Sequence, residues 1–183
     1  MKPVYRSQSL ALWLWIVVVT AWSGCLSAHS MYQSAVLLDF RGSRVETELQ
    51  LPLDRLSISF RRTVNASELA AERADLQAYV LAHVHPVMPD GRALSVQLVS
   101  MNIETVEQAP YLVVHLVLGA PERVNINAFT LNYDVITHEI VTHVVMVYLR
   151  SDSGARIPPG EPLLIGVIRG ERKSVSVDRL RLL

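Results

Sequence analysis

The chain has 183 residues, half of them hydrophobic, and its 17 lysine and arginine residues balance its 17 aspartate and glutamate residues. A formal net charge of zero and the absence of a basic run leave no field that would attract nucleic acid, so we do not expect nucleic-acid binding. The length and the apolar content suit one domain with a single packed core, rather than a disordered chain.

The N-terminus has the three parts of an export signal. A basic start is followed by an apolar run over residues 10–22 and by small residues that end at Ala28. The run is shorter than the roughly 20 residues with which a helix crosses a bilayer. We therefore predict a cleaved signal peptide over residues 1–28. Residues 29–183 are expected to form one periplasmic, or otherwise extracytoplasmic, domain without a membrane span.

Cys25, the only cysteine, lies within this signal. Cleavage after Ala28 removes it and leaves a mature chain without thiols, which fits an oxidising compartment. The alternative is a lipoprotein acylated at Cys25, but Trp22 stands where such signals usually have leucine, so we favour cleavage. Cleavage also makes His29 the first residue, with a free amine and an imidazole.

The first elements after the signal are expected to be two strands and a short ambiguous segment. Residues 35–40 are apolar, and residues 45–51 alternate apolar and polar side chains with the period of a half-buried strand. Together they predict a β-hairpin. Residues 53–60 fit either a short helix or a strand.

Residues 66–82 have the clearest helical pattern. Asn65 can cap this helix, and Glu68 stands three residues later, as in a capping box. Pro86 and the turn residues that follow it end the helix, because the residue before a proline is disfavoured in helical geometry.

The rest of the chain is expected to be β-structure. A change in apolar parity between Val124 and Tyr133 predicts a β-bulge there. The overall pattern predicts a mainly β fold, a two-layer antiparallel immunoglobulin-like sandwich with one inserted helix. The expected strands are residues 94–101, 111–118, 124–136, 143–150, 162–169 and 174–178.

Histidine is the residue type whose placement asks for a chemical explanation, because imidazole nitrogen is a common ligand of nickel, copper, cobalt and zinc. Residues 133–143 resemble a zinc-protease helix at first sight. However, His138 and His143 are five residues apart, whereas the protease motif needs four, and five places them about 140° apart on a helix. We therefore reject a zinc protease.

A hairpin corner over residues 136–144 would let His138 and His143 face each other. The alternative is that both are ordinary sheet residues. His29 could chelate a metal ion through its amine and its imidazole if it begins the mature chain, or it is simply the residue that follows the cleavage site. The candidate metal ligands are His29, His138 and His143, with Asp134 and Glu139 as additional carboxylates.

The remaining histidines are expected to have structural roles. His83 and His85 follow the predicted helix, where a cationic side chain favours the terminal carbonyl groups. His115 lies in an apolar strand and is expected to be a hydrogen-bonded core imidazole. The sequence has no G-x-S-x-G motif, no glycine-rich phosphate loop and no cysteine after the signal, so we expect no enzyme activity.

Three stretches carry a family resemblance: residues 28–39, 48–56 and 133–152, with residues 159–169 in agreement. They resemble the extracytoplasmic N-terminal domain of HupE/UreJ-like membrane proteins. The resemblance implies nickel or cobalt handling for hydrogenase and urease. In that family the metal path is attributed to histidine-bearing membrane helices, and this sequence reaches Leu183 before any such helix, so we do not expect it to be a permease.

The resulting expectation is a non-catalytic periplasmic domain that supports acquisition of nickel, cobalt or copper. It would do so by binding the metal ion or a separately encoded membrane permease. Two alternatives remain open: a protein-interaction domain of the cell envelope with purely structural histidines, and a truncated product of a HupE/UreJ-like gene.

Overall fold

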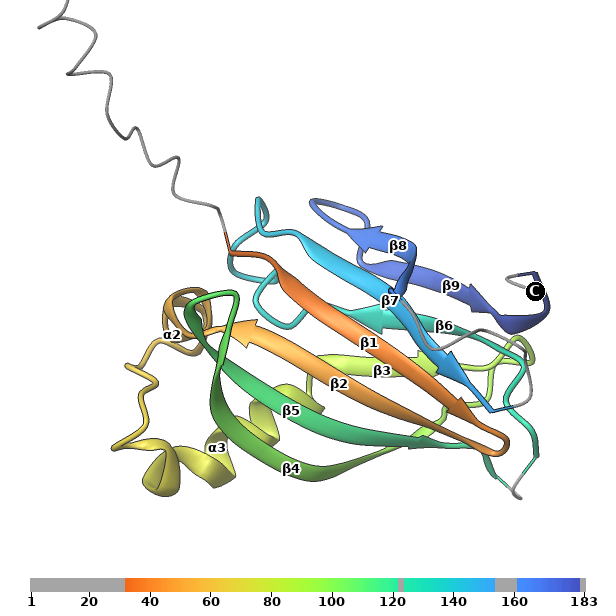
Figure 1. Ribbon diagram of the computed structural model, residues 1–183, viewed down its shortest axis with the longest axis horizontal. Coiled ribbons are helices and arrows are strands. Elements are labelled where there is room, and N and C mark those ends of the chain that lie inside the picture. Colours follow the sequence, from red (N-terminus) through yellow and green to blue (C-terminus); the bar gives the residue numbers. More distant parts are fainter. Residues whose placement is uncertain (1–31, 122–123, 154–160, 182–183) are drawn as a thin grey trace, which may run out of the picture. The chain divides into compact units, whose positions relative to one another are not determined.

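Two β-sheets pack face to face in the computed structural model, which describes residues 32–121, 124–153 and 161–181 (Figure 1). The predicted signal peptide and His29 lie outside the described residues. The larger sheet consists of β1 (Ser34–Arg41), β2 (Arg44–Pro52), β4 (Ser95–Val106), β5 (Ala109–Gly119), β7 (Val145–Asp152) and β8 (Leu163–Ile168), in the order β4–β5–β2–β1–β7–β8. The smaller sheet consists of β3 (Val84–Val87), β6 (Ala128–Tyr133) and β9 (Ser174–Asp178), in the order β3–β6–β9.

The predicted mainly β two-layer sandwich is confirmed, with one difference in strand direction. β1 and β2 form the predicted antiparallel hairpin, in which Arg41 stands opposite Arg44. β1 also pairs with β7, and this pair is parallel. The chain therefore brings its first described strand and a strand more than 100 residues later side by side in the centre of the larger sheet.

Within residues 32–121, two α-helices precede β3, where the sequence indicated one. The ambiguous segment forms α2 (Leu53–Phe60), which buries Leu53 and Leu56 against the core. α3 (Leu69–Leu81) is the predicted helix and begins later than expected. Asn65 lies in the turn before this helix, where its Oδ1 accepts the Glu68 backbone N–H at 3.0 Å, whereas the N-cap of α3 is Glu68, which makes no side-chain capping hydrogen bond. A short 3₁₀ helix, η2 (Arg179–Arg181), follows β9.

The predicted strand over residues 124–136 is shorter than expected. Only Ala128–Tyr133 pairs with β3 and β9, and neither register is interrupted, so the predicted bulge is wrong. Ile126 precedes the strand, yet it is fully buried, and its N–H donates to the Gly42 carbonyl at 3.0 Å. The apolar residues change parity here because the buried segment around Ile126 is not part of the strand, which begins only at Ala128.

The core lies between the sheets and is made of alternate residues of the strands. Leu38, Leu49 and Leu116 from the larger sheet and Phe129 and Tyr133 from the smaller are all at most 2% exposed. Each such side chain stabilises the fold by about 1.5–3 kcal/mol relative to exposure. Among residues 32–121, 124–153 and 161–181, no helix is both long and apolar enough to cross a bilayer.

Candidate functional site

The structure places the two predicted ligands His138 and His143 in different surroundings. His143 shares a hydrogen bond of 2.8 Å with the Ser34 hydroxyl at the start of β1, and it is 6% exposed. Burial, followed by the nearby positive charge of Arg55, lowers its pKa from 6.5 to about 4. His143 is thus a neutral, buried imidazole that joins β1 to the segment before β7.

His138 lies in a hydrogen-bonded turn rather than in a strand or a hairpin corner. Its backbone N–H donates to the Asp134 carbonyl at 3.0 Å, and the N–H of Ile140 donates to the Ile136 carbonyl at 2.9 Å. The ring Nδ1 is also 3.0 Å from the Asp134 carbonyl oxygen. The Asp134 carbonyl therefore contacts both the backbone N–H and the ring of His138.

His83 stacks on His138, a pair that the sequence analysis did not predict. The ring centroids are 4.1 Å apart and the planes differ by 18°. His83 Nδ1 is 2.7 Å from Asp134 Oδ1, while Lys173 Nζ is 3.8 Å from Asp134 Oδ2. We call His83 and His138 the histidine pair, and Asp134 is the carboxylate beside it. Tyr79 packs against both rings, at 4.9 Å and 5.7 Å between centroids.

Hydrogen bonding fixes which nitrogen of each ring carries the proton. An ionised carboxylate and a backbone carbonyl can only accept hydrogen bonds, so the Nδ1 atoms of His83 and His138 must both donate to Asp134. In the neutral ring the proton is then on Nδ1, and Nε2 carries a lone pair. One aspartate therefore orients two imidazoles with the same tautomer.

Ile136 holds a strained conformation within the turn that carries His138. Its φ is +69°, a left-handed value that is rare for a β-branched residue. Two hydrogen bonds keep it there: Ser59 Oγ donates to its carbonyl at 3.0 Å, and its N–H donates to the Tyr79 hydroxyl at 3.2 Å. Strain of this kind persists where the surroundings over-determine it, and often at functional sites.

A pocket of about 450 Å³ opens beside His83. Polar groups line it on several sides, and Lys173 adds positive charge where Glu171 and Asp134 add negative charge. The His85 ring donates from Nε2 to the Ala82 carbonyl at 2.9 Å, which confirms the helix-end role expected for His85. The full lining is Ala82, His83, His85, Asn132, Tyr133, Asp134, Glu171, Lys173 and Ser174.

The other predicted residues do not complete a ligand set around His138. Glu139 accepts a hydrogen bond of 2.7 Å from Arg61, just after α2. Within the described ranges, no three or more histidine, cysteine, aspartate or glutamate side chains are grouped closely enough to hold a metal ion. The expected core position of His115 is wrong, because it is partly exposed opposite Glu48 on the outer face of the larger sheet.

Neither a protein-family model nor a curated protein sequence matches the chain.

Proposed function

We propose that this protein is an extracytoplasmic, non-catalytic domain that binds a divalent transition-metal ion, nickel, cobalt or copper, through His83 and His138. The observation that carries the proposal is the shared use of Asp134 as acceptor for both Nδ1 groups. In the neutral form of each ring, the lone pair on Nε2 is thereby left for a ligand. An acceptor behind a ligating imidazole is the usual arrangement around protein-bound transition metals, since it fixes the ring and raises its basicity.

The pair supplies a partial coordination shell. Two imidazoles leave the other positions of an ion to water or to donor groups from a second molecule. Such a site releases its ion more readily than a closed site with four protein ligands. Ready release suits a protein that carries the metal ion and transfers it to another protein. We propose that the recipient is a separately encoded membrane permease of the envelope.

Ion capture also requires a movement of the rings. A metal ion binds in the plane of an imidazole, along the Nε2 lone pair, whereas the two planes here are nearly parallel. One ring must therefore turn out of the stack when both bind the same ion. His138 is the ring expected to turn, because its acceptor is a neutral carbonyl and that of His83 is a carboxylate.

Isothermal titration calorimetry of the full chain with NiCl₂ tests the proposal. We expect saturable heat at neutral pH and weaker binding in acid, because protonation of an imidazole removes the lone pair that would bind the ion. His83→Ala and His138→Ala should each lower the affinity at least about tenfold, and Asp134→Asn should lower it about 10–100-fold.

His115→Ala is the matched control, since it removes an imidazole from the opposite side of the molecule and should leave nickel binding unchanged. Absence of heat at neutral pH contradicts the proposal. Wild-type affinity in the His83→Ala, His138→Ala double variant contradicts it as well, and it would equally exclude the ligand set expected from the sequence, which includes His138.

A further inference from the structure

The described edge strands of the two sheets differ in how they are protected against pairing with another chain. At β4, the Arg73 guanidinium on α3 donates to the Met101 carbonyl at 3.0 Å. β3 has only four residues, including Pro86, whose carbonyl already accepts the Leu94 N–H at 3.0 Å. β9 carries the polar side chains of Ser174, Ser176 and Asp178. Covering groups, proline and polar residues are the devices that usually protect sheet edges.

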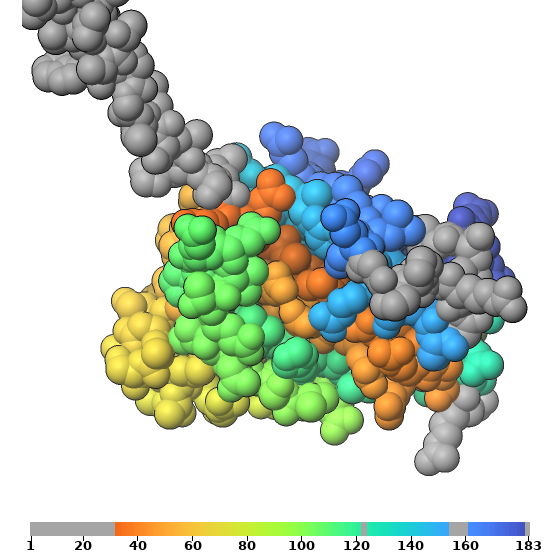
Figure 2. Space-filling view, in the orientation of Figure 1, coloured from red at the N-terminus to blue at the C-terminus, as the bar shows by residue number. Residues whose placement is uncertain are grey.

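β8 has none of these devices. Its sequence, LLIGVI, contains no charged or polar side chain and no proline. Leu163 and Leu164 are 46% and 45% exposed, and among the described residues β8 pairs within its sheet only with β7. Figure 2 shows the blue side chains of this region at the surface. An apolar, uncharged edge strand is a template for another strand.

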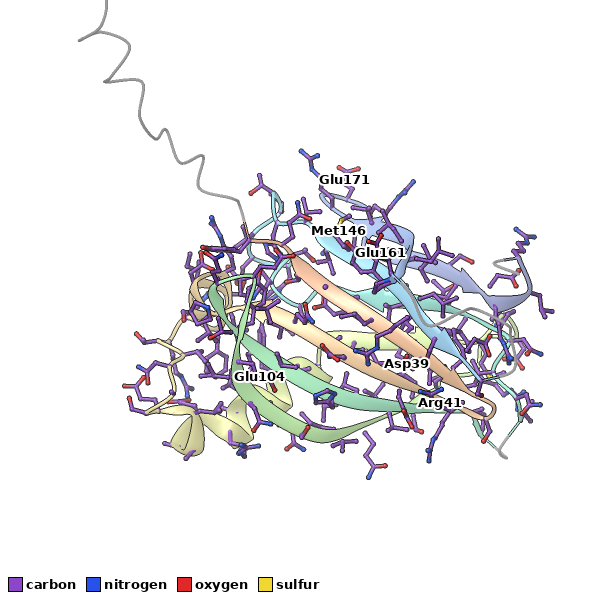
Figure 3. The ribbon with its side chains drawn as sticks, in the orientation of Figure 1. Asp39, Arg41, Glu104, Met146, Glu161 and Glu171 are labelled. Carbon is purple, nitrogen blue, oxygen red and sulfur yellow. The ribbon has the colours of Figure 1, made fainter. Side chains whose placement is uncertain are left out.

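The two ends of β8 carry opposite charges. Glu161 precedes the strand, and Arg169 follows it, with Arg172 opposite Arg169 in an isolated bridge. All three residues are exposed, and Figure 3 labels Glu161. In an antiparallel pair of two identical strands, the acidic end of each copy meets the basic end of the other. The edge is therefore complementary to itself in both charge and apolar character.

We propose that β8 pairs antiparallel with β8 of a second copy and joins the two larger sheets into one. The twofold arrangement buries Leu163 and Leu164 of both copies and sets Glu161 of each beside Arg169 of the other. The register between β7 and β8 shifts between Leu164 and Gly166, and such a bulge interrupts the edge. The dimer should therefore dissociate on dilution.

Sedimentation equilibrium of the full chain over a range of concentrations tests this interface. We expect the mass of one chain at low concentration and of two chains at high concentration. Leu164→Lys should remain monomeric throughout, because it places a charge in the pairing edge. Val99→Lys is the matched control: Val99 is an exposed apolar residue of β4, 63% accessible, and its replacement should leave the dimer intact.

Charge exchange tests the direction of the strands. Glu161→Arg and Arg169→Glu should each weaken the dimer at least several-fold, and the double variant should restore it. A wild-type chain that stays monomeric at every concentration contradicts the proposal, as does a dimer that Leu164→Lys leaves intact. Capture of an extended segment of another protein by a strictly monomeric chain contradicts it too.

Discussion

Ser34 and His143 are 109 residues apart in the sequence and share a buried hydrogen bond of 2.8 Å. Ser34 opens β1, and its N–H also donates to the Val144 carbonyl at 3.1 Å, next to His143. The two bonds fix the start of the parallel β1–β7 pair. Since burial lowers the pKa of His143 to about 4, this contact depends on an uncharged ring.

The first prediction is a loss of stability in mild acid. The unfolded chain takes up a proton on His143 near pH 6.5, whereas the folded chain does so only near 4, so stability falls as the pH drops between these values. The loss should reach about 2–3 kcal/mol. Urea unfolding at a series of pH values measures it. His143→Gln should flatten the curve in this window, and His115→Gln should not; equal slopes in all three proteins would contradict the assignment.

The second prediction concerns Arg150 on the outer face of the larger sheet. Its guanidinium donates to Asp39 Oδ2 at 2.6 Å and 2.9 Å and to Glu48 Oε2 at 2.6 Å, although Asp39 is only 4% exposed. Burial raises the pKa of Asp39, but hydrogen bonds from Arg150 and Ser151 outweigh it and leave the pKa lowered. Arg150→Met leaves two carboxylates without their cation and should cost about 3–5 kcal/mol in urea unfolding.

Arg44→Met provides the comparison for Arg150. Arg44 is 3.1 Å from Glu46, and both side chains are well exposed. Its removal should therefore cost less than about 1 kcal/mol. If Arg150→Met and Arg44→Met lowered the free energy of unfolding by similar amounts, burial would not strengthen the ion pairs of Arg150.

The third prediction concerns the contact between β8 and β9. A Cβ added at Gly166 would lie 2.5 Å and 2.7 Å from the two methyl carbons of Val175. Gly166→Ala should destabilise the protein by about 1–3 kcal/mol, because this part of the core has no room for a methyl group. Val175→Ala in the same chain should recover part of the loss. Additive losses in the double variant would show that the two residues do not meet.

The fourth prediction tests the support of the strained turn. Tyr79→Phe keeps the aromatic contact with both imidazoles but removes the acceptor for the Ile136 N–H. We expect a loss of about 1–3 kcal/mol in unfolding free energy, since the N–H belongs to a fully buried residue. Nickel affinity should fall as well, because the turn positions His138. Unchanged stability would mean that the turn does not depend on this bond.

Local patterns predicted most of the β-structure. The strict alternation before Pro52 predicted β2, and the last strand was predicted with its observed bounds, Ser174–Asp178. Asn65 and Glu68 indicated the start of α3 because a capping box is a contact between neighbours in sequence. β3 was missed because four residues around a proline give no period-2 signal.

The histidine pair could not be predicted in the same way. His83 and Asp134 are 51 residues apart, and only the pairing of β3 with β6 brings them together. The spacing of Asp134 and His138 by one helical turn was a usable local signal. The β-branched residues between Asp134 and His138 indicated a strand instead, because such residues favour strands in general. In the structure, hydrogen bonds from Ser59 and to Tyr79 hold Ile136 in a turn.

Imidazole ¹⁵N NMR of the full chain at mildly alkaline pH tests most directly whether His83 and His138 present two lone pairs. The account predicts that both rings carry the proton on Nδ1 and that Zn²⁺, a diamagnetic probe, shifts both Nε2 resonances and leaves those of His115 in place. A proton on Nε2 of either ring, or Nε2 resonances that Zn²⁺ does not move, would contradict it.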